Sequence, residues 1–128
     1  METTNVKPTI FLITAAILMA IGSPLLAHHG TAAFDTREVT VKGTVTSFSF
    51  VNPHCQVYWT VKTDKGVEEW QGELTAPTKL TRAGWTKRSL KAGDTITVSG
   101  QQVKSGSHTL WIRKLIGPDG QPMKLFED

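Results

Sequence analysis

Two adjacent histidines, His28 and His29, stand directly after an apolar stretch near the start of the chain. A free α-amine, the Nδ1 of a first-residue imidazole and one further histidine nitrogen together form a three-nitrogen site. Such a set favours copper, with zinc and nickel behind it. His54 or His108 could supply the third nitrogen. We predict a copper site made of His28, His29 and His54. The competing interpretation is a solvated terminal pair, with His54 hydrogen-bonded inside a turn.

This chemistry depends on where the mature chain begins. Lys7 precedes the apolar run PTIFLITAAILMAIG, which a helix-breaking Pro24 and a small residue, Ala27, follow. A positive start, an apolar centre and a small residue at the cut are typical of a secretory signal peptide. We predict a signal peptide helix over residues 1–27 and a periplasmic or secreted protein, in contact with the membrane only through this peptide before cleavage. An uncleaved anchor is the alternative, but the run from Ile10 is near the lower length limit for spanning a bilayer.

The exact cut affects the metal chemistry only in detail. A cut before Ala27 would give Ala27-His28-His29. A histidine in third position also suits Cu(II) or Ni(II), because deprotonated backbone amides complete the ligand set. Both cuts therefore leave a chelating N terminus.

Composition limits the other possibilities. The chain has 128 residues, which fits one domain, and its net charge of +3 is only mildly basic, whereas a nucleic-acid binder usually concentrates positive charge on one face. Its single cysteine, Cys55, cannot form an internal disulfide. Cys55 shares strand parity with Val57 and Trp59, so we expect a small buried residue. His54 points to the opposite face of an extended chain, which argues against a Cys–His nucleophile.

The predicted domain consists of short strands and turns. Residues 28–37 form a short N-terminal segment and residues 38–128 form one domain. The predicted elements are a long strand over 38–50 with a bulge and a kink at Gly43, strands at 55–63 and 67–74, a helix within 76–84, strands at 95–100 and 108–116, and a last short strand at 123–126. This order is typical of an all-β, OB-like five-stranded barrel with one short helix. An open sandwich of the same strands is the alternative.

Aromatic residues could provide a second kind of site. Trp59 and Trp70 have the parity of core residues, whereas Trp85 and Trp111 lie less obviously inside. Barrels of this type often stack ligands on exposed aromatic rings. We predict ligand binding by Tyr58, Trp85 and Trp111, although a second small core would also explain Trp111.

The acidic residues give no comparable prediction. Glu69 and Glu73 lie with Gln71 on the outward side of one predicted strand. Paired carboxylates do acid–base work only in a pocket that separates their pKa values. A solvated strand face is the simpler interpretation.

Four segments carry a resemblance to a known family, in this order: HHGTAAFD, VTVKGTVTSFSFVNPH, RAGWTKRSLKAGD and ITVSG. The chain resembles a family of small exported bacterial proteins of unknown function. The resemblance implies export and an OB-like fold, and no activity. Cys55 departs from the pattern, where a small residue such as alanine is expected, and this weakens any role for the thiol. The positions that match the pattern are His28, His29, Phe34, Asp35, Asn52, Pro53, His54, Gly84 and Trp85.

The sequence thus favours a periplasmic binding module rather than an enzyme, with copper held between the His28–His29 start and the Asn52-Pro53-His54 turn. The alternative is a metal-independent protein that binds a ligand or protein of the cell envelope. An enzyme is the third possibility, but no group of convergent polar residues beyond the histidines supports it.

Overall fold

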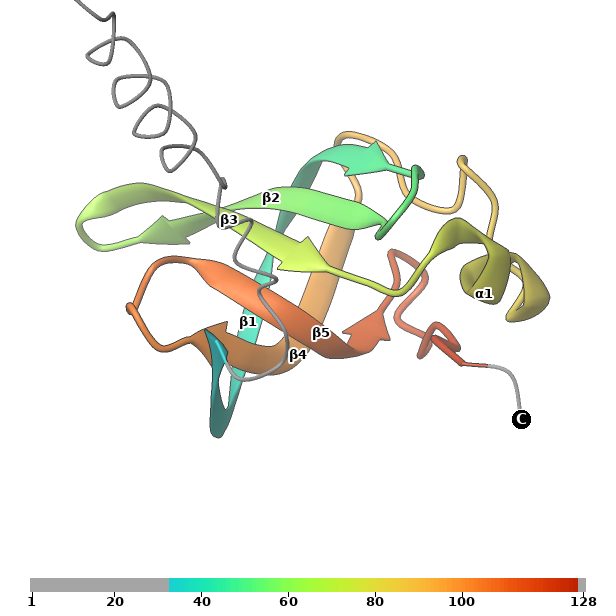
Figure 1. Ribbon diagram of the computed structural model, residues 1–128. Helices are drawn as coiled ribbons and strands as arrows, with labels where there is room; N and C mark the ends of the chain where they lie inside the picture. Colours follow the sequence, from blue (N-terminus) through green and yellow to red (C-terminus); the bar gives the residue numbers. More distant parts are fainter. Residues whose placement is uncertain (1–32, 127–128) are drawn as a thin grey trace, which may run out of the picture.

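A computed structural model describes residues 33–126; the predicted signal peptide and the pair His28 and His29 lie outside the described residues. Five strands and one helix follow one another along the chain (Figure 1). Their bounds are β1 Phe34–Ser49, β2 Gln56–Thr63, β3 Gly66–Glu73, α1 Pro77–Arg82, β4 Thr95–Val103 and β5 Thr109–Ile116. The prediction of a mostly β domain with five strands and one short helix is confirmed.

The strands form one closed sheet in the order β1-β2-β3-β5-β4. All pairs are antiparallel except β3 and β5, which run parallel. The closure depends on the long strand β1, which pairs with β4 up to Thr44 and with β2 from Thr44 onward. The pairing with β2 shifts register between Val45 and Ser47, which confirms the predicted bulge in this strand.

Gly43 lets β1 cross closely over β2. A Cβ at this position would lie 2.3 Å from the carbonyl oxygen of Thr60 and 2.6 Å from Cδ1 of Trp59. The bulge itself is also held by the segment just before β4, because the N–H of Val45 donates to the carbonyl of Asp94 at 2.8 Å. The predicted kink therefore involves two neighbouring features, a close approach at Gly43 and a bulge just after it.

The connection from β3 to β4 contains the helix. Pro77 occupies the first turn of α1, where a missing N–H costs nothing, and Gly84 follows the helix with a φ of +95°. Leu80 anchors this single short helix in the core with no exposed surface. In Figure 1, α1 lies at the end of the molecule away from the β2–β3 turn.

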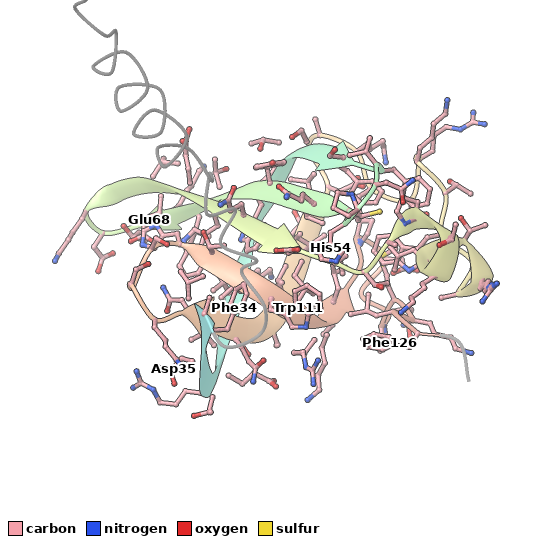
Figure 2. All side chains as sticks on the ribbon, in the orientation of Figure 1. Phe34, Asp35, His54, Glu68, Trp111 and Phe126 are labelled. Carbon is pink, nitrogen blue, oxygen red and sulfur yellow. The ribbon has the colours of Figure 1, made fainter. Side chains whose placement is uncertain are left out.

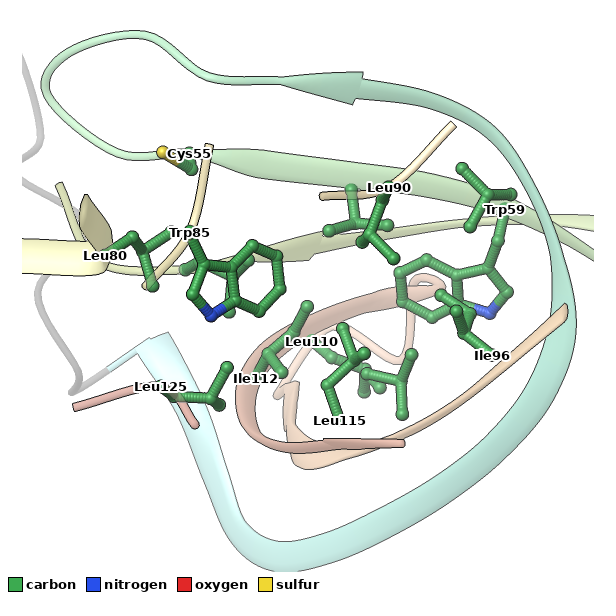
Figure 3. Packing of buried hydrophobic residues seen from close by; sticks show 14 of the residues in the cluster. Cys55, Trp59, Leu80, Trp85, Leu90, Ile96, Leu110, Ile112, Leu115 and Leu125 are labelled. Carbon is green, nitrogen blue, oxygen red and sulfur yellow. The ribbon is translucent and has the colours of Figure 1, made fainter. Parts of the chain in front are cut away.

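The core fills the inside of the sheet, as Figure 3 shows. Inward parity predicted Trp59, Trp70 and Leu74 correctly, since each is at most 8 % exposed. Cys55 is fully buried as predicted, and burial raises the pKa of its thiol. A buried, protonated thiol is a poor nucleophile.

Two element boundaries differ from the prediction. Strand β1 begins at Phe34 rather than Glu38, because the start of the strand pairs with the end of β4 through Phe34 and Val103. Residues 123–126 form no strand; next to this segment the chain makes one isolated bridge, Ile116 with Pro122, and the segment itself buries Leu125.

Trp85, which we expected to be accessible, is buried instead. Its side chain is only 3 % exposed, lies 5.7 Å from the ring of Phe48 and donates a 2.6 Å hydrogen bond from Nε1 to the carbonyl of Lys124. The turn after α1 places it under the C-terminal segment, a long-range contact that local sequence does not show. Within residues 33–126, no helix is long and apolar enough to span a membrane.

Candidate functional site

A histidine–carboxylate pair lies where the chain enters β2. The Nδ1 atom of His54 contacts Oε1 of Glu73, the last residue of β3. The antiparallel register brings them together, because Gln56 pairs with Glu73 and the N–H of Leu74 donates to the carbonyl of Cys55 at 2.8 Å. The two side chains are 43 % and 26 % exposed, so solvent reaches the pair.

Trp111 packs against the same pair. The parallel register of β3 and β5 places Trp111 beside Glu73, and its ring meets the imidazole of His54 edge-on, with centroids 5.7 Å apart. The ring of Phe34 lies 6.3 Å from that of Trp111 and is itself buried. Figure 2 shows Phe34, Trp111 and His54 on one side of the barrel. The three rings link the start of β1 to the His54–Glu73 pair.

The geometry assigns the two nitrogens of His54 different roles. Nδ1 is engaged by the Glu73 carboxylate, so Nε2 is the nitrogen left to bind something else. Metal-binding histidines commonly have this arrangement, with the second nitrogen held by a carboxylate. Among residues 33–126, however, no group of three or more His, Cys, Asp or Glu side chains gathers closely enough to hold a metal ion.

Glu73 was not among the predicted site residues. Its outward position was predicted correctly, but the solvated face proposed for it overlooked His54. The hairpin could have revealed the contact, because pairing Thr63 with Gly66 fixes the register that places Glu73 opposite the start of β2.

His108, the other histidine within the described residues, has different partners. Its ring stacks flat on Trp70, with centroids 4.5 Å apart and planes 6° from parallel, and its Nε2 lies 3.8 Å from Oε2 of Glu68. Nε1 of Trp70 donates to the same carboxylate at 3.0 Å. His108 thus belongs to a separate cluster on the β2–β3 side of the barrel.

Of the three aromatic residues predicted to bind a ligand, Tyr58 is half-buried and lies beside a depression. This surface depression of about 550 Å³ lies between β2, β3 and the loop before β5. Trp111 is half-buried beside Phe34, and its Nε1 has no hydrogen-bond partner within the described part of the chain. Trp85 is enclosed in the core.

The chain is thus a small closed β domain with a histidine–carboxylate pair on its outer face. The chain belongs to a protein family whose model matches residues 15–111 and is described as "Family of unknown function (DUF6152)". This membership confirms the resemblance to a family of unknown function. The search of curated proteins found no match.

The similar solved structures include apo TiaS, described as a tRNA agmatidine synthetase, with 24 % identity and a TM-score of 0.41. A complex of TiaS with tRNA and ATP shows 21 % identity and a TM-score of 0.44, and a tRNA fluorescent labeling enzyme shows 23 % and 0.43. The matches cover 62–63 % of this chain and only 17–18 % of the longer chains. They are too distant to support a functional argument.

Proposed function

We propose that the protein is a periplasmic or secreted OB-like binding module, not an enzyme, that holds copper at its mature N terminus. The ligands are the α-amine and imidazole of His28, or the imidazole of His29, together with Nε2 of His54. The observation that best supports this proposal is the position of the His54–Glu73 pair, two ring contacts from the start of β1.

The chain is long enough to close such a site. His29 precedes Phe34 by five positions, and an extended chain of that length spans up to about 17 Å. The ring centroids from Phe34 to Trp111 and from Trp111 to His54 are separated by 6.3 and 5.7 Å. A segment of this length would therefore let the terminal nitrogens reach His54.

The chemistry of the ligand set fits copper better than other metals. Three nitrogen donors without a thiolate favour Cu(II) in the order of divalent affinities. Cys55 is excluded as a ligand by its complete burial. The Glu73 carboxylate would hold His54 in one tautomer and one ring orientation, as carboxylates behind metal-binding histidines do. These features describe a site that binds a copper ion.

The proposal is tested by titrating Cu(II) into the mature protein against a competing chelator. We expect submicromolar affinity for the chain that begins at His28. The double variant His28→Ala/His29→Ala should bind at least tenfold more weakly. An unchanged titration in the double variant would exclude the proposed site.

A metal-independent binding module is the second candidate function. The position of Tyr58 on the wall of an open depression favours it, since this site uses none of the proposed copper ligands. It predicts binding of an envelope ligand that a chelator does not abolish. Loss of every such interaction on chelation would exclude this alternative.

A further inference from the structure

We infer that the outer face of β2 and β3 carries a binding groove for an uncharged polyhydroxyl chain, a neutral glycan. This inference is independent of the copper proposal and rests on the second candidate function, whose ligand it specifies. The groove consists of two adjoining depressions of about 550 and 270 Å³. They share Tyr58, Glu69 and Trp70, so together they extend from β1 across β2 and β3 to the loop before β5. This elongated shape suits several linked units of a chain better than a single small molecule.

The walls of the groove are held in place before any ligand binds. The hydroxyl of Tyr58 donates to Oε1 of Gln56 at 2.6 Å, which fixes the ring orientation. Gln71 lies directly across from Tyr58 on β3, and its Nε2 donates to Oγ1 of Thr109 at 3.1 Å. A preformed wall reduces the conformational entropy lost on binding.

The loop before β5 is fixed by stacked rings. His108 lies flat on Trp70, and Trp59 also stacks against this indole, with centroids 6.2 Å apart and planes 24° from parallel. Trp70 thus contacts two other rings and is only 8 % exposed, so Tyr58 is the aromatic ring of the groove that a ligand can stack on. The flat, partly apolar face of a sugar ring fits such a surface, because its C–H groups can cover the aromatic ring.

The charge of the groove selects against anions. The whole chain carries 14 lysines and arginines, yet within residues 33–126 none of them lines either depression. The polar residues of the lining are Glu69, Gln71, Ser107, His108 and Thr109 in the larger depression and Thr46, Ser47 and Thr60 in the smaller one. Carboxylate, amide and hydroxyl groups can hydrogen-bond the hydroxyl groups of such a ligand, whereas a phosphate-bearing polymer requires cationic contacts.

The test is affinity electrophoresis of the mature protein in native gels that contain one neutral polysaccharide each, namely hydroxyethylcellulose, xylan or dextran. We expect at least one polymer to retard the protein. Tyr58→Ala should weaken this retardation at least fivefold and Gln71→Ala at least threefold. Tyr58→Phe keeps the ring and loses only the hydrogen bond to Gln56, so it should retain most of the binding, which separates the stacking surface from that hydrogen bond.

Phe126→Ala is the matched control, since Phe126 is an aromatic residue with 53 % exposure outside the groove, labelled in Figure 2 near the C-terminal end. Its retardation should equal that of the unmodified protein. Chelator, or the variant His28→Ala/His29→Ala, should change nothing. No retardation by any of the three polymers, equal retardation of Tyr58→Ala, or binding of the polycation spermine in their place would overturn the assignment.

Discussion

The imidazole of His54 contacts the carboxylate of Glu73 through Nδ1, and the same imidazole meets the ring of Trp111 edge-on. Three separate parts of the chain create this arrangement: the turn before β2, the end of β3 and the start of β5. The contact leaves Nε2 of His54 as its one ring nitrogen for a further partner. The predictions about copper depend on this division between the two nitrogens.

Replacing Glu73 should weaken copper binding without removing a ligand. In Glu73→Gln the carboxylate that fixes the tautomer of His54 is lost, and we expect about a tenfold to hundredfold loss of Cu(II) affinity. The measurement is a competitive Cu(II) titration. Glu69→Gln is the matched control, because Glu69 lies on the same face of β3 and pairs with Thr60 instead. Equal affinities of the two variants would contradict the role of Glu73.

The two histidines of the barrel should behave differently toward copper. His54→Ala removes the proposed third nitrogen and should lower Cu(II) affinity at least tenfold. His108→Ala should leave the affinity unchanged, because His108 contacts Trp70 and Glu68 on another part of the surface. Electron paramagnetic resonance of the Cu(II) complex checks the same point, since only His54→Ala should change the nitrogen couplings. A larger effect of His108→Ala would show that His54 is not the third ligand.

Gly43 should tolerate no side chain. A Cβ there would lie 2.3 Å from a backbone oxygen of β2, so Gly43→Ala should destabilise the protein by about 2 kcal/mol or more in urea unfolding. Gly72→Ala should cost less, because the nearest atoms to its added Cβ belong to the Ile112 side chain, Cδ1 and Cγ1, rather than to the backbone. Lys42→Ala, on the more exposed side of β1, should remain within about 0.5 kcal/mol. Equal stability of all three variants would disprove the close crossing of β1 and β2.

Asp94 should make stability depend on acid pH. The side-chain hydrogen bond from Lys91, joined by a backbone hydrogen bond from the same residue, lowers the pKa of Asp94 below 3.8. The ionised carboxylate therefore adds stability above pH 3.8, and this contribution disappears as the pH falls through the lowered pKa.

We expect Asp94→Asn to lose about 1 kcal/mol at pH 7, a modest value because Lys91 is in solvent. The difference from the unmodified protein should shrink toward zero in urea unfolding at strongly acidic pH, below the lowered pKa of Asp94. Asp64→Asn, in the exposed β2–β3 turn, serves as the control. A difference that stays constant with pH would show that Asp94 acts through packing alone.

The sequence predicted the parts of the fold that depend on short-range patterns. Strand alternation correctly placed Trp59 and Leu74 inside, and the change of phase along β1 indicated the bulge that appears after Val45. Pro77 and Gly84 correctly predicted the two ends of the helix, because each residue restricts or permits backbone conformations at its own position. These features need no knowledge of distant contacts.

The errors arose where distant segments meet. Trp85 is buried because its indole N–H reaches the carbonyl of Lys124, far along the chain. Glu73 was predicted to face only solvent, because the pattern of its own strand does not indicate a contact with His54. The hairpin register brings the two residues together. The proposed ligands His28 and His29 lie outside the described residues, so the copper site stays a prediction from sequence and chain reach.

The most direct test of the copper proposal is native mass spectrometry of the protein purified from the periplasm and supplied with one equivalent of Cu(II). We expect a single species that begins at His28, or one residue earlier, and retains one copper atom. A chain that still carries its first 27 residues, a terminus trimmed beyond His29, or a correctly cut chain that retains no copper would contradict the proposal.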